Sequence, residues 1–355
     1  MTGNNILKGL KVVELASVLA GPSVGTFLAE MGAEVIKVEN PDTGGDITRR
    51  WKLPAEDPDS TVSAYYCSAN WNKESIFLDL KKDADRQNVR TLIADADILL
   101  ENFKPGDSIK FSLDYKSVKL LNPRLIVGHI QAYSDQDAPG FDVVIQAECG
   151  FMSLNGPAPE GLKWPLPIVD ILAAHQLKEG ILLALIQRAQ TGRGSLVSVS
   201  LFDAAVASLY NIGGNVLMGG ADPVATGRLH ANIAPYGETV TSSDGVTIVL
   251  AVGTDQQFHS LCEILNCTKD FTDSFSTNSM RVRDRGTMET TLRNHARRIG
   301  FDVLEKGLIG KKVPFGKVKT VKEVLASLPE NSFLREKTEG VGTVRMRTAI
   351  FTIDT

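Results

Sequence analysis

The sequence predicts an α/β protein in which a large domain with a doubly wound parallel sheet is joined to a smaller α+β domain. Two observations indicate this organisation. Short apolar runs alternate with helical patterns between residues 10 and 130, which is typical of parallel strands joined by helices. A stretch rich in glycine and proline at 218–237 then precedes a hairpin pattern, which indicates a change of domain.

The first strand–helix–strand unit consists of "LKVVELA" at 10–16, "GPSVGTFLAEMGA" at 21–33 and "EVIKVEN" at 34–40. We place Pro22 at the first helical position and Gly32 at the stop, because proline is favoured at the start of a helix and glycine just after its end. This unit therefore begins the predicted parallel sheet.

The alternation of strands and helices continues along the chain. Apolar runs and helical spacing predict strands at 75–81, 97–103 and 124–130, with helices at 82–96 and 112–123. The later elements of the large domain are one long helix from Ile171 to about Gln190, and then a strand and a helix within 195–215.

The smaller domain is predicted from the middle of the chain. A hairpin around "SSDG" at 238–252 and a helix at 254–266 are followed by basic helical residues at about 280–310. The expected boundaries are residues 1–210 for the large domain, completed by about 318–355, then 225–317 for the small domain and 211–224 for the linker.

The composition favours a small molecule or another subunit as partner, rather than nucleic acid or a membrane. The 38 basic and 42 acidic residues are interspersed, which argues against a basic surface for either. The longest apolar stretch, "GILLALI", is far shorter than the ~20 residues that span a bilayer, and the N-terminus lacks a signal sequence. The four cysteines form no metal-ligand cluster. We therefore expect a cytoplasmic protein with reduced thiols and no metal.

The first unit resembles a dinucleotide site only in outline. A strand leads to glycines at a helix start, and Glu39 ends the second strand where a ribose-binding acid would lie. The turn is "LAGPSVG", however, and lacks the G-x-G-x-x-G that lets the backbone approach a pyrophosphate. This argues against a nicotinamide oxidoreductase, although the helix start can still hold part of a phosphorylated ligand.

One aspartate stands at the head of an apolar helical run, in "PIVDILAAHQLKEG" at 167–180. The residues alone leave two interpretations of Asp170 open. It is a helix N-cap, whose loss would cost about 1 kcal/mol, or it is the nucleophile of an enzyme. With an ordinary pKa of about 3.9 it is expected to be ionised at neutral pH, held by backbone N–H groups of the helix start that also stabilise an oxyanion.

Several motifs in order resemble the class III CoA-transferases of the CaiB/BaiF type, which include formyl-CoA transferase, carnitine CoA-transferase and the 2-methylacyl-CoA racemases. The matching segments are "LKGLKVVELASVLAGPSVGTFLAEMGAEVIKVENP", "NKESIFLDLK", "ADILLENFKPG", "NPRLIVGHI", "GFDVVIQAECGFMSLNG", "VDILAAHQLKEGILLALIQRAQTGRG" and "VSLFDAAVASL". The resemblance returns in "GRLHANIAPYG" and "VPFGKVKTVKEVL", and so covers most of the chain.

The resemblance implies a Rossmann-like large domain, a small domain from the middle of the chain and an interlocked homodimer. It also implies transfer of CoA from an acyl-CoA donor to a carboxylic acid, with the CoA thioester as substrate and no permanently bound cofactor. Asp170 occupies the place of the nucleophile, and Asp142 that of an acid which contacts the acyl group or the nucleophile. Racemases of the family carry histidine just before this acid; Phe141 stands there and cannot transfer a proton.

The resemblance also assigns the CoA-binding positions. They lie along the CoA, near its adenine and phosphates, and beside its pantetheine: Val18, Leu19, Ala20, Leu78, Asp79, Leu80, Lys81, Asn102, Phe103, Lys104 and Lys110. Asn40 departs from the family, because many members have a basic residue at this position. Two alternatives stay open: a racemase or epimerase of the same fold, with His129 or His175 as base, and a non-catalytic CoA-binding homologue.

Overall fold

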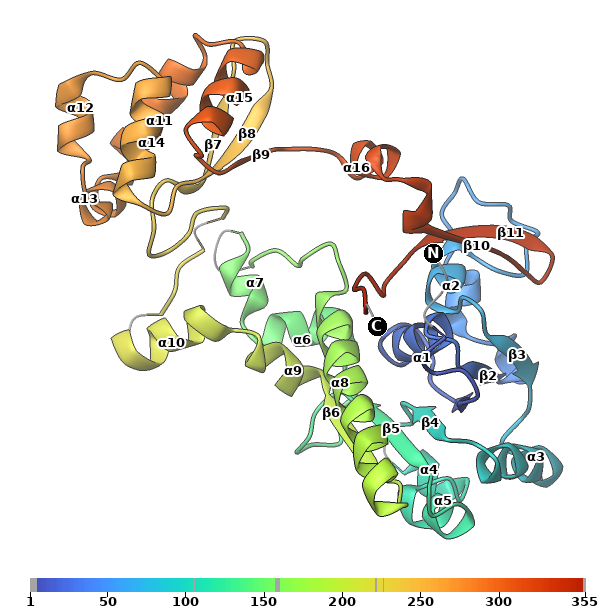
Figure 1. The fold of residues 1–355 in the computed structure, drawn as a ribbon. Helices are drawn as coiled ribbons and strands as arrows, with labels where there is room; N and C mark the ends of the chain where they lie inside the picture. Colours follow the sequence, from blue (N-terminus) through green and yellow to red (C-terminus); the bar gives the residue numbers. More distant parts are fainter. Residues whose placement is uncertain (1–4, 105, 157–159, 221, 226, 354–355) are drawn as a thin grey trace. The chain divides into compact units, whose positions relative to one another are not determined.

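The structure is a computed structural model that describes residues 5–104, 106–156, 160–220, 222–225 and 227–353 (Figure 1). The chain forms two compact units. The first comprises Met1–Met152, Leu162–Pro223 and Pro329–Thr355, and the second comprises Ser153–Gly161 and Val224–Leu328. The chain thus returns to the first unit at Pro329, later than the position near residue 318 that the sequence suggests.

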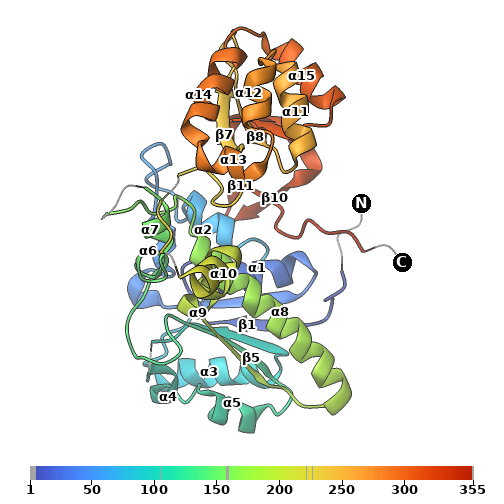
Figure 2. The ribbon, with the colours of Figure 1, turned by 90° about the vertical axis from the view of Figure 1, so that its left-hand side faces the viewer.

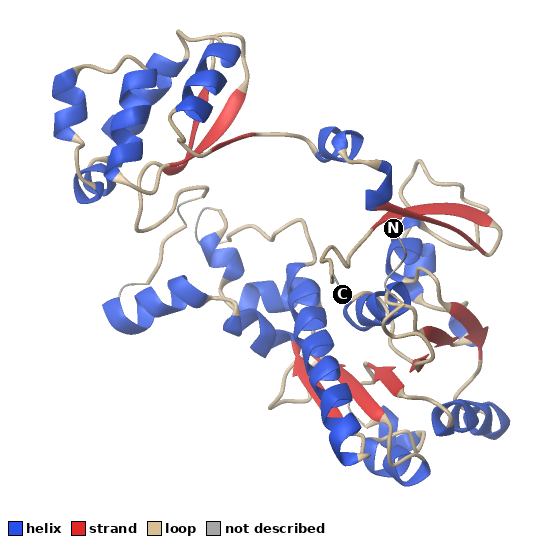
Figure 3. Ribbon diagram, viewed as in Figure 1, coloured by secondary structure: helices blue, strands red, loops and turns tan. Residues whose placement is uncertain are grey.

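The first unit is built on a six-stranded sheet in which all neighbouring strands are parallel. Their order is β3-β2-β1-β4-β5-β6, so the chain starts in the middle and winds first to one edge and then to the other. The strands, red in Figure 3, are β1 (Lys11–Glu14), β2 (Glu34–Glu39), β3 (Glu74–Phe77), β4 (Ile98–Glu101), β5 (Ile126–Gln131) and β6 (Leu196–Ser200). The predicted parallel sheet is confirmed.

Helices cover both faces of this sheet (Figure 2). On one face lie α1 (Ala20–Glu30) and α8 (Ile168–Thr191), and on the other lie α3 (Asp83–Ala94) and α5 (Tyr115–Leu121). Parallel strands covered in this way carry apolar residues on both sides, which explains their nearly continuous hydrophobic runs.

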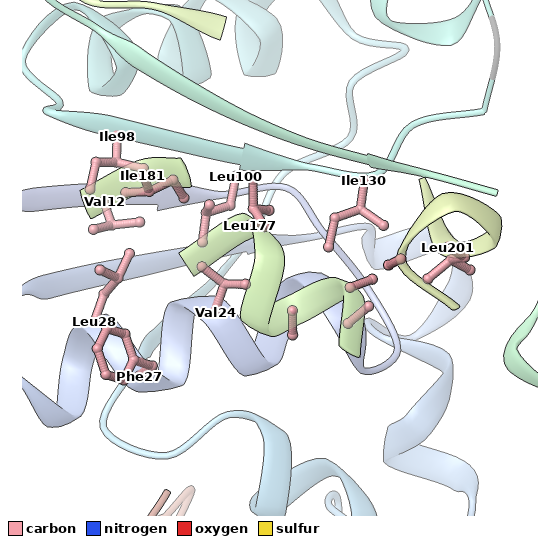
Figure 4. Packing of buried hydrophobic residues seen from close by; sticks show 14 of the residues in the cluster. Val12, Val24, Phe27, Leu28, Ile98, Leu100, Ile130, Leu177, Ile181 and Leu201 are labelled. Carbon is pink, nitrogen blue, oxygen red and sulfur yellow. The ribbon is translucent and has the colours of Figure 1, made fainter. Parts of the chain in front are cut away.

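Adjacent residues of one strand therefore belong to two different cores. Val12 packs with Val24 of α1 and Leu177 of α8 (Figure 4), whereas Val13 packs with Val89 and Ile93 of α3. All six side chains are buried. The two cores hold the sheet rigid, so the loops at its carboxyl edge start from fixed points.

The remaining elements of the first unit are shorter. The helices are α2 (Ala64–Ala69), α4 (Asp107–Lys110), α6 (Asp142–Glu148), α9 (Leu201–Ala207) and α10 (Tyr210–Gly219), and the antiparallel strands are β10 (Phe333–Thr338) and β11 (Val341–Met346). The short 3-10 turns are η1 (Pro41–Thr43), η2 (Ile47–Arg50) and η3 (Glu330–Ser332). The division between the two units falls within α7 (Phe151–Leu154). Helix α10 occupies most of the stretch 211–224 that we expect to be a linker.

Two helices start earlier than the sequence predicts. α1 begins at Ala20, so Pro22 is its third residue rather than its first. Proline is tolerated there because the first four N–H groups of a helix have no partner within the helix. α8 begins at Ile168, so Asp170 lies inside its first turn and is not its N-cap.

The second unit carries a three-stranded antiparallel sheet formed by β7 (Tyr236–Thr241), β8 (Thr247–Ala251) and β9 (Phe315–Lys317). The hairpin predicted at 238–252 is confirmed. The helices of this unit are α11 (Asp255–Ile264), α12 (Lys269–Ser274), α13 (Asn278–Arg283), α14 (Arg285–Ala296), α15 (Phe301–Gly310) and α16 (Val321–Ser327). Phe258, Met288 and Leu304 are part of its separate buried core.

Among the described residues, no helix has both the length and the apolar character needed to cross a membrane. The four cysteines are free thiols. Within the same residues, no group of three or more histidine, cysteine, aspartate or glutamate side chains is arranged to hold a metal ion.

Candidate active site

The start of α8 is held by a carboxylate from another helix. Asp142, the first residue of α6, accepts hydrogen bonds at Oδ1 from the backbone N–H of Val169 (2.8 Å) and of Asp170 (3.4 Å). Its Oδ2 accepts from Nε2 of the buried Gln146 at 2.6 Å. Gln146 Oε1 in turn accepts from the N–H of Trp164 at 2.7 Å. Asp142 thus caps α8 and lies directly beside Asp170.

The other free N–H groups of this helix start are also occupied. Ile168 donates to the carbonyl of Leu166 at 2.8 Å, and Ile171 donates to that of Pro167 at 3.1 Å. Among the described residues, no donor is hydrogen-bonded to the Asp170 carboxylate. The expectation that backbone N–H groups hold this carboxylate is therefore wrong, because Asp142 and nearby carbonyls take them.

Burial, and then the charge of Asp142, raise the pKa of Asp170 from an ordinary value of 3.8 to about 7. Burial disfavours the charged form of a carboxyl group, and a like charge disfavours it further. The expectation that Asp170 is fully ionised at neutral pH is therefore wrong. Protonated and ionised forms are both populated near pH 7, which is where acid–base groups at active sites are commonly tuned.

A tyrosine that the sequence did not single out lies within electrostatic reach of this acid pair. Tyr65 is in α2, and its ring packs edge-on against Trp51 with 5.2 Å between centroids. Burial, and then the charges of Asp170, Asp142 and Asp46, raise the pKa of Tyr65 to about 12. Its phenol therefore stays protonated and is available as a donor. "SAYYCSAN" carries no recognisable motif, so only the fold reveals this position.

A cavity of about 560 Å³ lies at the carboxyl ends of β1 to β4, where doubly wound sheets bind their ligands. Seven predicted CoA-binding residues meet there, namely Leu78, Asp79, Leu80, Lys81, Asn102, Phe103 and Lys104. Val18, Leu19, Ala20 and Lys110 are not among its lining residues. The loop after β1 instead lines the cavity through Leu15, Ala16 and Ser17.

The cations around this cavity differ in what binds them. Lys81 is exposed and pairs with Asp42 at 3.1 Å, whereas Lys104 is exposed with no ion pair to any described residue. Arg50, which the sequence analysis did not select, also lines the cavity and donates to the carbonyl of Thr43 at 3.0 Å. Lys110 lies outside, with its ammonium 5.5 Å from the ring centroid of Phe111, a lining residue.

Asn102, which we predict to bind CoA, and Asn40, which departs from the family, both form hydrogen bonds with nearby backbone groups. Asn102 Oδ1 accepts from the N–H of Ser17, and its Nδ2 donates to the Ser17 carbonyl, both at 3.0 Å. Asn40 accepts from the N–H of Asp42 at 2.9 Å and thereby caps the turn η1. Both side chains therefore shape the cavity through its loops.

His129, one of the two histidines that a racemase could use as its base, is engaged elsewhere. Its Nδ1 lies 2.7 Å from a carboxylate oxygen of Glu101, and its Nε2 lies 3.2 Å from the side-chain oxygen of Gln131. Burial, the largest single effect, lowers the pKa of His129, but the hydrogen bond to Glu101, the charge of Glu101 and the hydrogen bond to Gln131 together outweigh it, so the pKa is raised. Phe141 is 62% exposed and is the residue before Asp142, so it supplies no base either.

A doubly wound sheet with a cavity at its carboxyl edge is typical of α/β proteins that bind a ligand at this edge. Residues 7–355 match CoA-transferase family III, and the chain belongs to this family. It is thus an enzyme of the CoA-transferase class, as the sequence resemblance implies.

Relatives support the assignment over most of the chain. Succinate–glutarate CoA-transferase of Agrobacterium fabrum is 37% identical over 90% of this chain and 82% of its own length. Succinyl-CoA:glutarate CoA-transferase of Homo sapiens is 33% identical over 91% of this chain and 74% of its own. A CaiB/BaiF family protein of Brucella suis, 37% identical, has a similar structure with a TM-score of 0.82, covering 99% of this chain and 93% of that one.

The raised pKa of Asp170 predicts how its carboxyl group affects the stability of the fold. Between about pH 4 and 7 the folded protein binds a proton at Asp170 that the unfolded chain has released, so this carboxyl group lowers stability as the pH rises through that range. We expect Asp170→Asn to raise the Tm by roughly 3 °C or more at pH 8 and by less at pH 4.5. Scanning calorimetry at both pH values measures the change in Tm. A decrease in Tm at pH 8, or an increase there no larger than at pH 4.5, would contradict the raised pKa.

Proposed function

We propose that the chain transfers CoA from an acyl-CoA to a free carboxylic acid through covalent intermediates on Asp170. The observation that carries this proposal is the carboxylate pair at the start of α8, where Asp142 binds the helix N–H groups and no described residue donates to Asp170. A carboxylate without hydrogen-bond donors retains its nucleophilic lone pairs for the substrate.

The first half of the proposed reaction releases the donor acid. The Asp170 carboxylate attacks the thioester carbonyl carbon, the carbon–sulfur bond breaks, and CoA leaves as thiolate from a mixed anhydride. The thiolate then attacks the aspartyl carbonyl, and the donor acid leaves as its carboxylate. The acceptor carboxylate repeats these two steps in reverse, which regenerates free Asp170 and gives the new acyl-CoA.

The remaining site residues have supporting roles in the proposal. The cavity at the carboxyl edge of the sheet binds the nucleotide part of CoA, with Lys104, Lys81 and Arg50 offering cations to its phosphates. The Tyr65 phenol, whose pKa the charges of Asp170 and Asp142 help to raise, is the donor we propose for the oxyanion that forms during attack, an effect typically worth about a hundredfold or more in rate.

Succinyl-CoA as donor and glutarate as acceptor are the substrates we propose to test first, because the human relative is named for both and the Agrobacterium fabrum relative is named for succinate and glutarate. The engagement of both His129 ring nitrogens and the presence of Phe141 count against the racemase alternative, for which His175 stays open as a base. Cytoplasmic location stays a prediction.

The covalent mechanism is tested by trapping. The protein is incubated with succinyl-CoA and other short acyl-CoAs, treated with hydroxylamine, and digested for mass spectrometry. We expect an aspartyl hydroxamate at Asp170, because hydroxylamine attacks the activated carbonyl of the anhydride or thioester. We further expect Asp170→Asn to lower kcat by at least ~10³-fold, as for other covalent nucleophiles.

The matched control for trapping is Asp114→Asn, which changes another acid at a helix start of the same unit. Asp114 caps α5 and accepts from the N–H of Lys116 and Ser117. This variant is expected to keep both the adduct and the rate. Bound CoA without an adduct from any donor would contradict the mechanism and leave the non-catalytic CoA-binding homologue.

The pH dependence of the reaction is a second test. Because only ionised Asp170 is nucleophilic and its pKa is about 7, kcat/KM is expected to rise with pH and level off above about pH 8. Asp142→Asn removes the neighbouring charge, so the rising limb is expected to shift to lower pH. Initial rates from pH 5.5 to 9 measure the limb, and an unchanged midpoint would show that Asp142 does not control the nucleophile.

A homodimer is the expected assembly, and the surface of the first unit supports it. Leu183 and Ile186 of α8 and Leu217 and Met218 of α10 are 67%, 58%, 88% and 92% exposed, and such apolar side chains are usual at subunit interfaces. We expect light scattering after size exclusion to give about twice the 38.4 kDa of one chain. A mass of one chain at micromolar concentration would contradict the dimer.

A further inference from the structure

The loop between β1 and α1 contains a backbone conformation that needs support. Val18 has φ 72°, in the left-handed region that a β-branched residue rarely adopts. Such conformations cost free energy and persist only where the surrounding structure enforces them, commonly at functional sites. The preceding residues of this loop, Leu15 to Ser17, line the cavity.

Buried or bridging side chains fix this loop residue by residue. Lys37 Nζ donates to the carbonyl of Ala16 at 2.7 Å. Asn102 binds both backbone groups of Ser17. The N–H of Val18 donates to the Asp46 carboxylate, at 3.1 Å to Oδ2. Three consecutive residues are thus each held by a different side chain.

Asp46 is the centre of this arrangement. Its side chain is 1% exposed and pairs with the equally buried Lys37 at 3.1 Å. Its Oδ1 accepts from the N–H of Thr48 at 3.0 Å and from the Thr48 hydroxyl at 2.8 Å. Its own N–H donates to Glu39 at 2.7 Å. Both carboxylate oxygens therefore have partners.

The charge of Asp46 is unfavourable for the ligand itself. Asp46 lines the cavity that we propose binds the phosphates of CoA, and a carboxylate repels phosphate. Lys37 neutralises this charge at close range. A role in holding the loop explains why an acid lies there, whereas a direct role in binding the phosphates does not.

We propose that Asp46 is a positioning residue, which holds Val18 in its left-handed conformation and so fixes the cavity wall against which CoA binds. This inference rests on the proposed function for its ligand. It predicts that Asp46 acts on CoA affinity through the backbone of the loop, without contacting the reacting atoms at Asp170.

The first variant is Asp46→Asn, which keeps the size of the side chain but removes its charge. One oxygen becomes an NH₂ donor, so the asparagine cannot accept from both Val18 and Thr48 as the carboxylate does. We expect the Kd of CoA by calorimetry and the KM of the acyl-CoA to rise about tenfold, with kcat changed less than threefold. Hydrogen exchange of the Val18 amide is expected to become faster.

The second variant adds Val18→Gly to Asp46→Asn. Glycine adopts positive φ without steric cost, so the loop then needs less enforcement, and we expect most of the lost CoA affinity to return. A role of Asp46 in direct contact with CoA would not give this rescue. The control is Glu30→Gln, which breaks a buried 2.7 Å ion pair with Arg345 at the other end of α1 and is expected to lower Tm without changing the Kd of CoA.

Four outcomes decide the inference. A folded Asp46→Asn variant with unchanged or tighter CoA binding would overturn it, as would failure of Val18→Gly to restore affinity. The same loss of affinity in Glu30→Gln would overturn it too, because the effect would then be general destabilisation. If the wild type binds no CoA, the proposed function fails, and the exchange rate of the Val18 amide still shows whether Asp46 holds the loop.

Discussion

The carboxyl edge of the sheet depends on two ion pairs of the buried carboxylate of Glu14. Glu14 is the last residue of the central strand β1 and has no exposed surface, and the ammonium groups of Lys37 and Lys73 lie 3.0 and 2.8 Å from its carboxylate. Lys73 also donates to the carbonyls of Pro22 in α1 (2.8 Å) and Ala69 in α2 (2.9 Å). Because removing one partner of a buried ion pair typically costs about 3–5 kcal/mol, these interactions fix the strand and both helices together.

How much of this follows from the sequence depends on the distance between partners along the chain. The apolar neighbours Val12 and Val13 form a local pattern that is typical of a strand buried on both faces, and each side chain packs in a different core. The start of α8 is harder, since Asp170 has the residue type of an N-cap and its local sequence supports that interpretation. The actual capping group is Asp142, which comes from another helix, and no local pattern reveals a cap from elsewhere in the chain.

The same reason explains which site residues the sequence missed. The segments Leu78–Lys81 and Asn102–Lys104 follow strands β3 and β4, so their meeting at one cavity follows from a parallel sheet. Asp46 and Tyr65 lie in irregular or short helical segments after β2, where periodicity carries no information. Their roles depend on Lys37 and on the acid pair, which only the packed structure brings near them.

The acid pair also has a consequence for the energetics of the proposed reaction. When Asp170 is ionised, its charge is buried close to that of Asp142, and this repulsion is part of the reason for its raised pKa. Acylation converts the Asp170 carboxylate into a neutral anhydride or thioester, so the repulsion is absent from both of these acyl intermediates. An interaction that destabilises the free ionised enzyme more than the intermediate lowers the barrier for attack on the thioester. In the proposed mechanism, Asp142 thus favours the covalent step while it also holds the helix start.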